Sequence, residues 1–355
     1  MSKAKKILLA PLDWGLGHAS RCIPIIKACL ENGSEVVIAG TETTNALIRL
    51  EFPQLNYLDL KGYNIFYTNM KWMLPLSMIL QFPKILLRMR HENNWLKRVV
   101  AESQIDLVIS DNRYGLYHSE VPCFFITHQL QIQVPQSKWV QQMVNKLNHS
   151  MIKKFTICLV SDYEKESMSA DLSQKGTLEN VVYLGNLSRF NANEKDEKKY
   201  DLLLILSGPE PQRSLLEEKF KSAFEYCPYK TLIVRGKPGS NLSNNSPSHK
   251  TVDHLNAKEL QTAILSAEII ICRSGYSSVM DLIKLNRHAV LIPTPGQTEQ
   301  EYLGKYLMDK KWFLTVGQDT HSLQEILDQY HSFPFQKFPE WDLELYKEQM
   351  SMLLS

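Results

Sequence analysis

The sequence lacks the features that would place it in several common protein classes. Its six cysteines are widely spaced, with no CxxC pair and no cysteine–histidine cluster, so neither a zinc site nor a disulfide framework is expected. Forty basic and 38 acidic side chains leave a net charge of +2, which gives no reason to expect a nucleic-acid partner. No apolar run reaches the roughly 18 residues that a membrane-spanning helix needs.

Several catalytic motifs are also missing. The sequence contains no GxxxxGK[ST], no HExxH and no GxSxG, which argues against a P-loop enzyme, a zincin and an α/β-hydrolase. It contains no DxD, which argues against a divalent metal ion that bridges a diphosphate. We therefore expect no metal site and no cofactor, and any phosphate charge must be met by helix N-termini and arginines.

What remains is typical of a folded cytoplasmic protein. The chain has 355 residues, of which 44% are hydrophobic and 22% charged. At about 150 residues per domain, this length predicts two domains. The apolar run at residues 7–12 is too short for a signal peptide and is interpreted as a first buried strand.

Short apolar runs alternate with helical patterns in both halves of the chain. Continuous apolar strands with helices between them predict parallel sheets covered on both faces, hence an α/β fold with two doubly wound halves. A helix is expected over 19–31, ended by Asn32-Gly33, and another over 212–224. A polar stretch at 191–200 lies near the domain boundary, and a helical tail is expected over 341–354. The expected strands are 7–10, 36–39, 107–110, 123–126, 157–160, 202–206, 231–234, 269–272 and 289–292.

The turn after the first strand is the first candidate site. Gly15 and Gly17 allow a tight turn and a close backbone approach to a ligand, and His18 then opens the next helix. An imidazole at a helix N-terminus tends to stay neutral, so His18 is a candidate general base. A helix-capping histidine remains the alternative.

A second candidate follows the strand at 107–110. Asp111 lies at the carboxyl end of that strand, where it can orient His18 and stabilise its protonated form. An aspartate that caps a helix is the alternative interpretation. His128, after the strand at 123–126, is a weaker candidate, for which a structural hydrogen bond is the favoured interpretation.

In the second half, small polar residues follow three strands. Ser207 and Gly208 come after the strand at 202–206 and can present donors to phosphates. The run 272–281, CRSGYSSVMD, turns from a strand into a helix whose N-terminus can bind an anion. The run 293–302, PTPGQTEQEY, is a loop stiffened by proline that opens another helix and can contact sugar hydroxyls.

These runs resemble the C-terminal domain of family 28 glycosyltransferases, the MurG-like enzymes. The resemblance rests on CRSGYSSVMDL (272–282), PTPGQTEQEY (293–302) and LSGPEPQ (206–212), and GLGHASR (15–21) is similar to the family's N-terminal loop. It implies a GT-B fold, in which two Rossmann-like domains face a cleft and a C-terminal helix packs back on the first domain. It also implies an acceptor-binding domain at 1–188, to which 336–355 return, and a nucleotide-sugar domain at 189–335.

The resemblance also implies roles for individual residues. Asp281 takes the place of the acidic residue that binds the nucleotide ribose, and Arg189 that of an arginine facing the diphosphate. Gln300 and Glu301 fall where a polar pair contacts the donor sugar, and Glu301 departs from the usual residue there. The remaining donor-binding residues are Ser207 and Gly208 in the phosphate loop, and Arg273, Ser274, Gly275, Ser277 and Ser278 in the turn that faces the diphosphate.

The implied reaction is an inverting sugar transfer from a UDP-sugar to an acceptor hydroxyl, with His18 as the base. Two alternatives remain. The first is a nucleotide-sugar hydrolase, because GxGH with Arg21 also resembles the hydrolase of pseudaminic acid biosynthesis, which transfers the sugar to water. The second is a catalytically inactive module that only binds a sugar nucleotide.

Residues 70–99 form a candidate membrane face. The segment mixes large apolar residues with lysines and arginines, a composition typical of a helix at an anionic bilayer surface. The similar region of MurG-like enzymes faces the membrane. An amphipathic core helix with snorkelling basic side chains is the alternative. We expect a cytoplasmic protein with a nucleotide-sugar donor, an acceptor still to be identified, and a peripheral membrane contact on the inner face.

Overall fold

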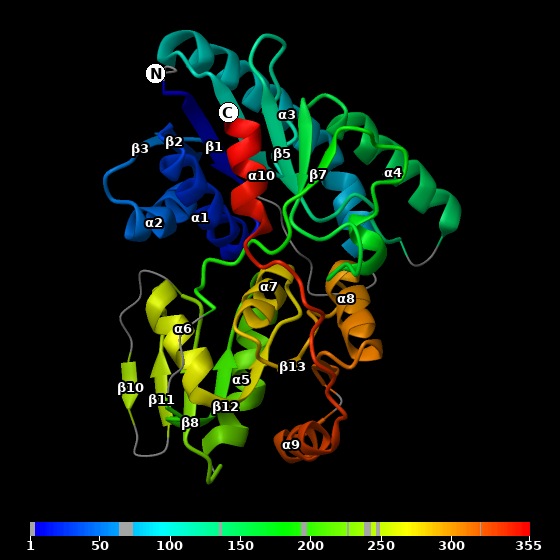
Figure 1. Ribbon diagram of the computed structural model, residues 1–355. Helices are drawn as coiled ribbons and strands as arrows, with labels where there is room; N and C mark the ends of the chain where they lie inside the picture. The colour runs from blue at the N-terminus through cyan, green and yellow to red at the C-terminus, as the bar shows by residue number, and fades with distance from the viewer. Residues whose placement is uncertain are drawn as a thin grey trace. The chain divides into compact units, whose positions relative to one another are not determined.

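Two seven-stranded sheets organise the chain, which the computed structural model describes at residues 4–63, 74–134, 137–192, 197–225, 227–237, 243–245, 249–319 and 321–355. Of residues 74–80, 222, 225 and 243–245, only the backbone is described. The chain divides into two units, with one sheet in each (Figure 1). The first unit takes the described residues up to Ser188 together with Trp341–Ser355, and the second takes Arg189–Glu340.

The first sheet is parallel and has the strand order β3-β2-β1-β4-β5-β6-β7. Its strands are β1 (Lys6–Pro11), β2 (Glu35–Gly40), β3 (Asn56–Asp59), β4 (Leu107–Asp111), β5 (Cys123–Thr127), β6 (Ile157–Val160) and β7 (Val181–Tyr183). The helices of this unit are α1 (Leu16–Glu31), α2 (Glu42–Glu51), α3 (Leu74–Ser103), α4 (Lys138–Ile152), α10 (Leu345–Leu354) and the short 3-10 helix η2 (Ala170–Ser173).

Alternate residues of these strands are buried on opposite faces of the sheet. Leu8 of β1 and Val108 of β4 lie in one apolar cluster with Leu96 of α3 and Ile152 of α4. Helix α1 packs beside α2 and α10, and against β1 and β2. The strands are therefore apolar throughout because helices cover the sheet on both sides.

The strand order places β1 beside β4, which is the point where the chain changes its direction of growth across the sheet. Pro11, the last residue of β1, lies opposite Asp111, the last residue of β4. In open α/β sheets, ligands bind at the carboxyl ends of the strands at such a switch point. The turn from β1 into α1 and the end of β4 therefore share one site.

The second sheet has the order β10-β11-β9-β8-β12-β13-β14, and only β10 is antiparallel to its neighbour. Its strands are β8 (Tyr200–Ile205), β9 (Thr231–Val234), β10 (Ser243–Asn245), β11 (His249–Val252), β12 (Ala267–Cys272), β13 (Val290–Leu291) and β14 (Leu314–Thr315). Its helices are α5 (Gln212–Glu225), α6 (Ala257–Ser266), α7 (Tyr276–Lys284), α8 (Thr298–Asp309) and α9 (Leu323–Ser332). The switch point lies between β8 and β12, where Ile205 is opposite Cys272.

The end of the chain belongs to the first unit, as the GT-B resemblance implies. Trp341 stacks on Tyr163 with ring centroids 5.5 Å apart, and the Tyr163 hydroxyl donates to the backbone carbonyl of Asp342 over 2.8 Å. Lys5 donates to the carbonyl of Leu354 at the other end of α10. The expected C-terminal helix is therefore confirmed, although it begins at Leu345 rather than at Trp341.

The units divide between Ser188 and Arg189, where the resemblance placed the domain boundary, and the segment that returns to the first unit begins at Trp341 rather than at residue 336. Some predicted strand boundaries were wrong. The strand expected over 289–292 is only Val290–Leu291. Five strands were missed, namely β3, β7, β10, β11 and β14, because each has only two to four residues, too few for a clear strand pattern.

Candidate active site

The first part of the site is the turn between β1 and α1. Gly15 has φ +95°, a conformation that side-chain-bearing residues rarely adopt, and it precedes the first residue of α1. His18 lies in the first turn of α1, and its side chain is mostly buried. The strand, the glycine turn and the helix together bring an imidazole to the carboxyl end of the sheet.

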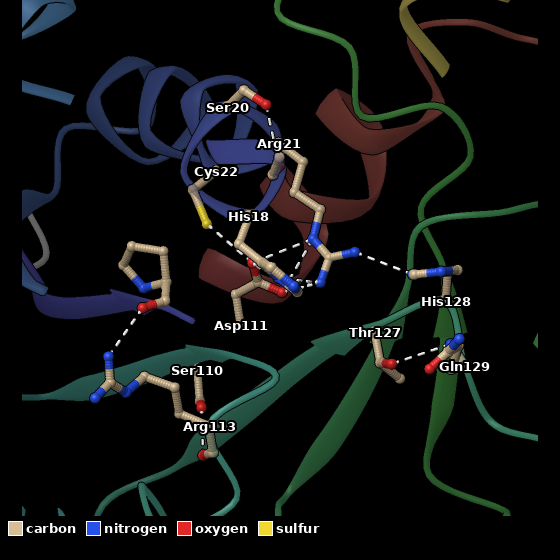
Figure 2. A network of polar contacts seen from close by, with 12 residues as sticks. His18, Ser20, Arg21, Cys22, Ser110, Asp111, Arg113, Thr127, His128 and Gln129 are labelled. Atoms are coloured by element: carbon tan, nitrogen blue, oxygen red, sulfur yellow. Dashed lines mark hydrogen bonds and ion pairs between the residues drawn. The ribbon is translucent and has the colours of Figure 1, made fainter. Parts of the chain in front are cut away.

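Asp111 meets His18 at this point. Its carboxylate oxygen Oδ2 lies 3.0 Å from Nδ1 of His18, and Asp111 is completely buried (Figure 2). No helix follows Asp111, so the capping role considered above does not apply; Asn112 instead turns the chain with φ +55°. The two residues that the sequence proposed for proton transfer are therefore in contact.

Arg21 is the third member of the cluster, and the sequence argument gave it no part in this site. It lies three residues after His18 and hence on the same face of α1. Its Nε lies 3.0 Å from Oδ1 and 3.1 Å from Oδ2 of Asp111, and its Nη2 also pairs with Oδ1. The signal was a charged residue within an otherwise apolar helix face.

His128 completes the cluster. It follows β5, the neighbour of β4, and its Nδ1 lies 3.1 Å from Nη1 of Arg21. The structural hydrogen bond that the sequence favoured for His128 is thus present, and its partner is a residue of the site (Figure 2).

Charge in this cluster is set by burial and by Arg21. Burial raises the pKa of Asp111, but the positive charges of Arg21 and His18 outweigh it, and the pKa is held below its ordinary value. Burial lowers the pKa of His18, Asp111 raises it and Arg21 lowers it again, with a net shift downward. Near neutral pH the site therefore holds a carboxylate beside a neutral imidazole, which is the state that a general base requires.

A second buried ion pair shapes the loop after β4. Arg113 Nε donates to Glu92 of α3 over 2.7 Å, and its other nitrogens donate to the backbone carbonyls of Pro11 and Lys61. Ser110 donates to the carbonyl of Arg113 over 2.7 Å. These bonds tie the ends of β1 and β4 together and so help to fix the position of Asp111.

In the second unit, the predicted phosphate-binding residues follow β8 and β12, the two strands at the switch point. Gly208 has φ +99°, and a Cβ there would lie 3.7 Å from the Thr294 hydroxyl, so the backbone has free space in front of it. Gly275 immediately precedes α7, whose first turn holds Ser277 and Ser278. The N–H groups of that turn and its serines can bind an anion.

Asp281 and Arg189 come together in the same unit. Nε of Arg189 lies 4.0 Å from Oδ2 of Asp281, and both side chains are mostly buried. His254, which the sequence did not indicate, lies near Arg189: burial and the charge of Arg189 lower its pKa. A carboxylate and a guanidinium therefore lie together, with a neutral imidazole near the guanidinium, and this set can contact a ribose and a diphosphate.

The remaining predicted donor residues form hydrogen bonds with their own or neighbouring loops. Arg273 is buried and donates to the backbone carbonyls of Ile292, Pro293 and Gln212, so it joins three loops. Gln300 accepts from the backbone N–H of Thr294 over 2.9 Å, and Glu301 accepts from that of Gly296 over 2.9 Å. Ser274 donates to the carbonyl of Gln300 over 3.0 Å.

The structure describes only part of the segment predicted to face a membrane, residues 70–99. Trp72 lies outside the described residues, as do the side chains of Leu74 and Ile79. Phe82, Leu86 and Leu87 are exposed on α3, whereas Trp95 packs against the core. No helix of the described chain is long and apolar enough to cross a membrane.

Helix α4 carries an apolar stripe that the sequence argument missed. Trp139, Met143 and Leu147 follow one another at four-residue spacing and are 69%, 53% and 44% exposed. The helix contains no acidic residue, and Lys138 and Lys146 are exposed on it. Its composition therefore suits the same kind of surface as that of α3.

Comparison with known proteins finds a family model that matches most of the second unit. Residues 207–337 match the model of the glycosyltransferase family 28 C-terminal domain. Over 111 residues the chain is 30% identical to the UDP-N-acetylglucosamine--N-acetylmuramyl-(pentapeptide) pyrophosphoryl-undecaprenol N-acetylglucosamine transferase of Sulfurihydrogenibium sp. (strain YO3AOP1). That match spans 30% of this chain and 30% of the relative.

Solved structures of glycosyltransferases share the fold over nearly the whole chain. The glycotransferase of kitacinnamycin aligns with a TM-score of 0.67 and 11% identity, over 99% of this chain and 95% of that one. MurG of Acinetobacter baumannii aligns with a TM-score of 0.53 and 14% identity, over 99% and 94%. The glycosyltransferase VinC, solved with dTDP, aligns with a TM-score of 0.57 and 13% identity, over 98% and 95%. The GT-B fold expected from the sequence is confirmed.

Proposed function

We propose that this chain, which carries a glycosyltransferase family 28 C-terminal domain at residues 207–337, moves a sugar from a UDP-sugar to an acceptor hydroxyl and inverts the anomeric carbon. The observation that carries the proposal is the 3.0 Å contact between His18 Nδ1 and Asp111 Oδ2 at the switch point of the first sheet. A base in one unit and a family 28 donor domain in the other are the two parts that such a transfer needs.

His18 acts as the general base. When Nδ1–H donates to Asp111, the lone pair of Nε2 is available to take the proton of the acceptor hydroxyl. The hydroxyl oxygen then attacks the anomeric carbon as the bond to the UDP oxygen breaks, and this single displacement inverts the configuration. Asp111 stabilises the imidazolium that forms.

The second unit binds the donor and stabilises the leaving group. The N-terminus of α7, with Ser274–Ser278 before and within it, faces the charge that develops on the diphosphate. Asp281 accepts hydrogen bonds from the ribose hydroxyls, and Arg189 neutralises phosphate charge. Gln300 and Glu301 turn from their own loop to the donor sugar. Helix amides and a guanidinium meet the phosphate charge, so no metal ion is needed.

The acceptor is lipid-linked in this proposal. The curated relative bears a pyrophosphoryl-undecaprenol substrate in its name, and this chain exposes apolar and basic side chains together on α3 and α4. A peripheral contact with an anionic bilayer would bring the first unit to such an acceptor. We include α4 in this surface because its stripe is the more exposed of the two.

A nucleotide screen followed by a turnover assay tests the proposal. Thermal unfolding is measured with UDP, GDP, ADP, dTDP and NAD, and a ligand at 100 times its Kd should stabilise by about 2.7 kcal/mol. Stabilisation by UDP, then UDP release from a UDP-sugar only when a lipid acceptor is added, supports the proposal. Release without acceptor would show a hydrolase. A shift with dTDP or another nucleotide alone would overturn the UDP assignment.

A further inference from the structure

One guanidinium in the first unit contacts three catalytic-site side chains. Arg21 pairs with both oxygens of Asp111, and its Nη1 and Nη2 lie 3.1 and 2.9 Å from Nδ1 of His128 and of His18 (Figure 2). Arg21 is only 2% exposed. Because an arginine stays protonated and has only donors, every one of these contacts must be accepted by the other side.

The contact with Arg21 fixes the state of His128. Its Nδ1 has to accept, so the ring hydrogen of the neutral imidazole must lie on Nε2. A second proton on Nδ1 would place two N–H groups against each other, next to a positive charge. The contact therefore selects one tautomer of the neutral His128 ring, with the hydrogen on Nε2.

His18 faces opposite demands at the same atom. Asp111 Oδ2 can only accept from Nδ1, whereas Arg21 Nη2 can only donate to it, and the two distances are nearly equal at 3.0 and 2.9 Å. If Nδ1–H donates to Asp111, Nε2 is free to act as the base. If Nδ1 accepts from Arg21, the hydrogen moves to Nε2, and His18 cannot take a proton there.

The charge of the cluster decides how readily His18 is protonated. Histidine and aspartate alone would carry one negative charge, which favours an imidazolium. With Arg21 the buried group is neutral, so each added proton creates a net positive charge away from water. The other titratable groups near His18 are His128, whose charge when protonated also lowers the pKa of His18, and the Cys22 thiol. That thiol lies 3.7 Å from Asp111 Oδ2, and burial raises its pKa well above the usual value.

We propose that Arg21 is a positioning residue, which holds Asp111 against His18, fixes the tautomer of His128 and keeps His18 an unprotonated base at a lower pH than a histidine–aspartate pair would allow. The role of His18 as base rests on the proposed function. The effects of Arg21 on the protonation of His18 and on the tautomer of His128 do not, since both can be measured without any substrate.

The first test is an NMR titration of the full-length protein labelled with ¹⁵N-histidine, with His18→Gln and His128→Gln used for assignment. Arg21→Gln should raise the pKa of His18 by about one unit or more, because a charge within hydrogen-bond distance is removed. Arg21→Lys keeps the charge, so the pKa of His18 in this variant should be lower than in Arg21→Gln. The matched control is Lys27→Gln, which removes an exposed charge from the same helix and should leave His18 unchanged.

Two outcomes of this titration would overturn the proposal. One is a pKa of His18 in Arg21→Gln, or in Arg21→Met should the former not fold, that equals the wild-type value. The other needs no variant: a hydrogen on Nδ1 of the neutral ring of wild-type His128.

The second test is the pH profile of kcat/KM for sugar transfer. In Arg21→Gln the acidic limb should move up by the same amount as the pKa of His18. The loss in kcat/KM should therefore grow as the pH falls, and below the wild-type pKa of His18 it should approach a value about tenfold greater than the loss at pH 9. A loss that is equal at all pH values would mean that Arg21 only braces the fold, and would overturn the proposal. Wild-type protein without transfer activity would contradict the proposed function, while the titration would still decide the role of Arg21.

Discussion

His18 Nδ1 lies 3.0 Å from Asp111 Oδ2, although the two residues are 93 positions apart in the chain. The contact arises because β1 and β4 are parallel neighbours whose last residues, Pro11 and Asp111, lie opposite each other. Each side chain alone has a structural explanation. Together, at the switch point of an open sheet, they form the pair that general-base catalysis requires.

Replacing His18 should separate chemistry from donor binding. His18→Ala should lower kcat by roughly 10²- to 10⁴-fold, the usual contribution of a general base, while UDP affinity stays nearly unchanged because the donor is bound by the other unit. Turnover assays and calorimetric titration with UDP measure the two effects. His91→Ala, which removes an exposed histidine of α3, is the control. Equal losses of turnover and UDP affinity would show a structural histidine instead.

Asp111 should matter for stability as well as for turnover. Asp111→Asn leaves the buried Arg21 without its counter-charge, so we expect a loss of about 3–5 kcal/mol in the free energy of unfolding at neutral pH. Urea denaturation of wild type and variant measures it. Removing both charges in Arg21→Met/Asp111→Asn should cost less than Asp111→Asn alone.

The pH dependence of this loss follows from the lowered pKa of Asp111. Folding favours the ionised carboxylate. Its contribution to the free energy of unfolding is therefore complete above the pKa of Asp111 in the unfolded chain, near 3.8. This contribution disappears as the pH falls from there through the lower pKa of the folded protein. The gap between wild type and Asp111→Asn should therefore narrow at pH values below 3.8. A gap that stays constant with pH would contradict an ionised Asp111 in the folded protein.

The sequence predicted the architecture because the central strands are nearly continuous apolar runs. In the first sheet β1, β2, β4, β5 and β6 were all expected within one residue of their observed ends. The missed strands lie at or next to the sheet edges and carry little apolar signal: β11 reads HKTV and β14 has two residues. Only pairing with a neighbour identifies such strands.

The candidate site was predictable only where its residues end strands or open helices. His18 and Asp111 were found in this way, and so were Gly208 and the turn before α7. Arg21 lies within a helix, where the side that faces the sheet is decided by packing. The contact of His128 depends on β5 being next to β4, an order that the sequence does not state.

Donor binding in the second unit should depend on Asp281. Losing a hydrogen bond that involves a charged group costs about 1.5–3 kcal/mol, so Asp281→Asn should weaken UDP binding by roughly 10- to 100-fold. At 100 times the wild-type Kd, the stabilisation by UDP should shrink from about 2.7 kcal/mol to about 0.4–1.4 kcal/mol. Asp328→Asn, an exposed change on α9 of the same unit, is the control. An unchanged UDP affinity in Asp281→Asn would remove the ribose contact from the proposal.

The stripe on α4 should contribute to binding at a membrane surface. In Trp139→Ser/Met143→Ser two exposed apolar side chains are lost, and each contributes up to about 1.5–3 kcal/mol when it is fully buried in an apolar environment. Co-sedimentation with vesicles of phosphatidylglycerol and phosphatidylcholine should fall by about tenfold or more, and Phe82→Ser should weaken it further. High salt should weaken wild-type binding, because the lysines of α4 are screened.

The control for this surface is Leu50→Ser on α2, since Leu50 is 62% exposed but lies outside the stripe. It should leave vesicle binding unchanged. None of these variants should lower the melting temperature, because all the altered side chains are exposed. If the double variant of α4 sediments with anionic vesicles as well as the wild type and Leu50→Ser do, the stripe does not touch the bilayer, and the lipid-linked acceptor loses its structural support.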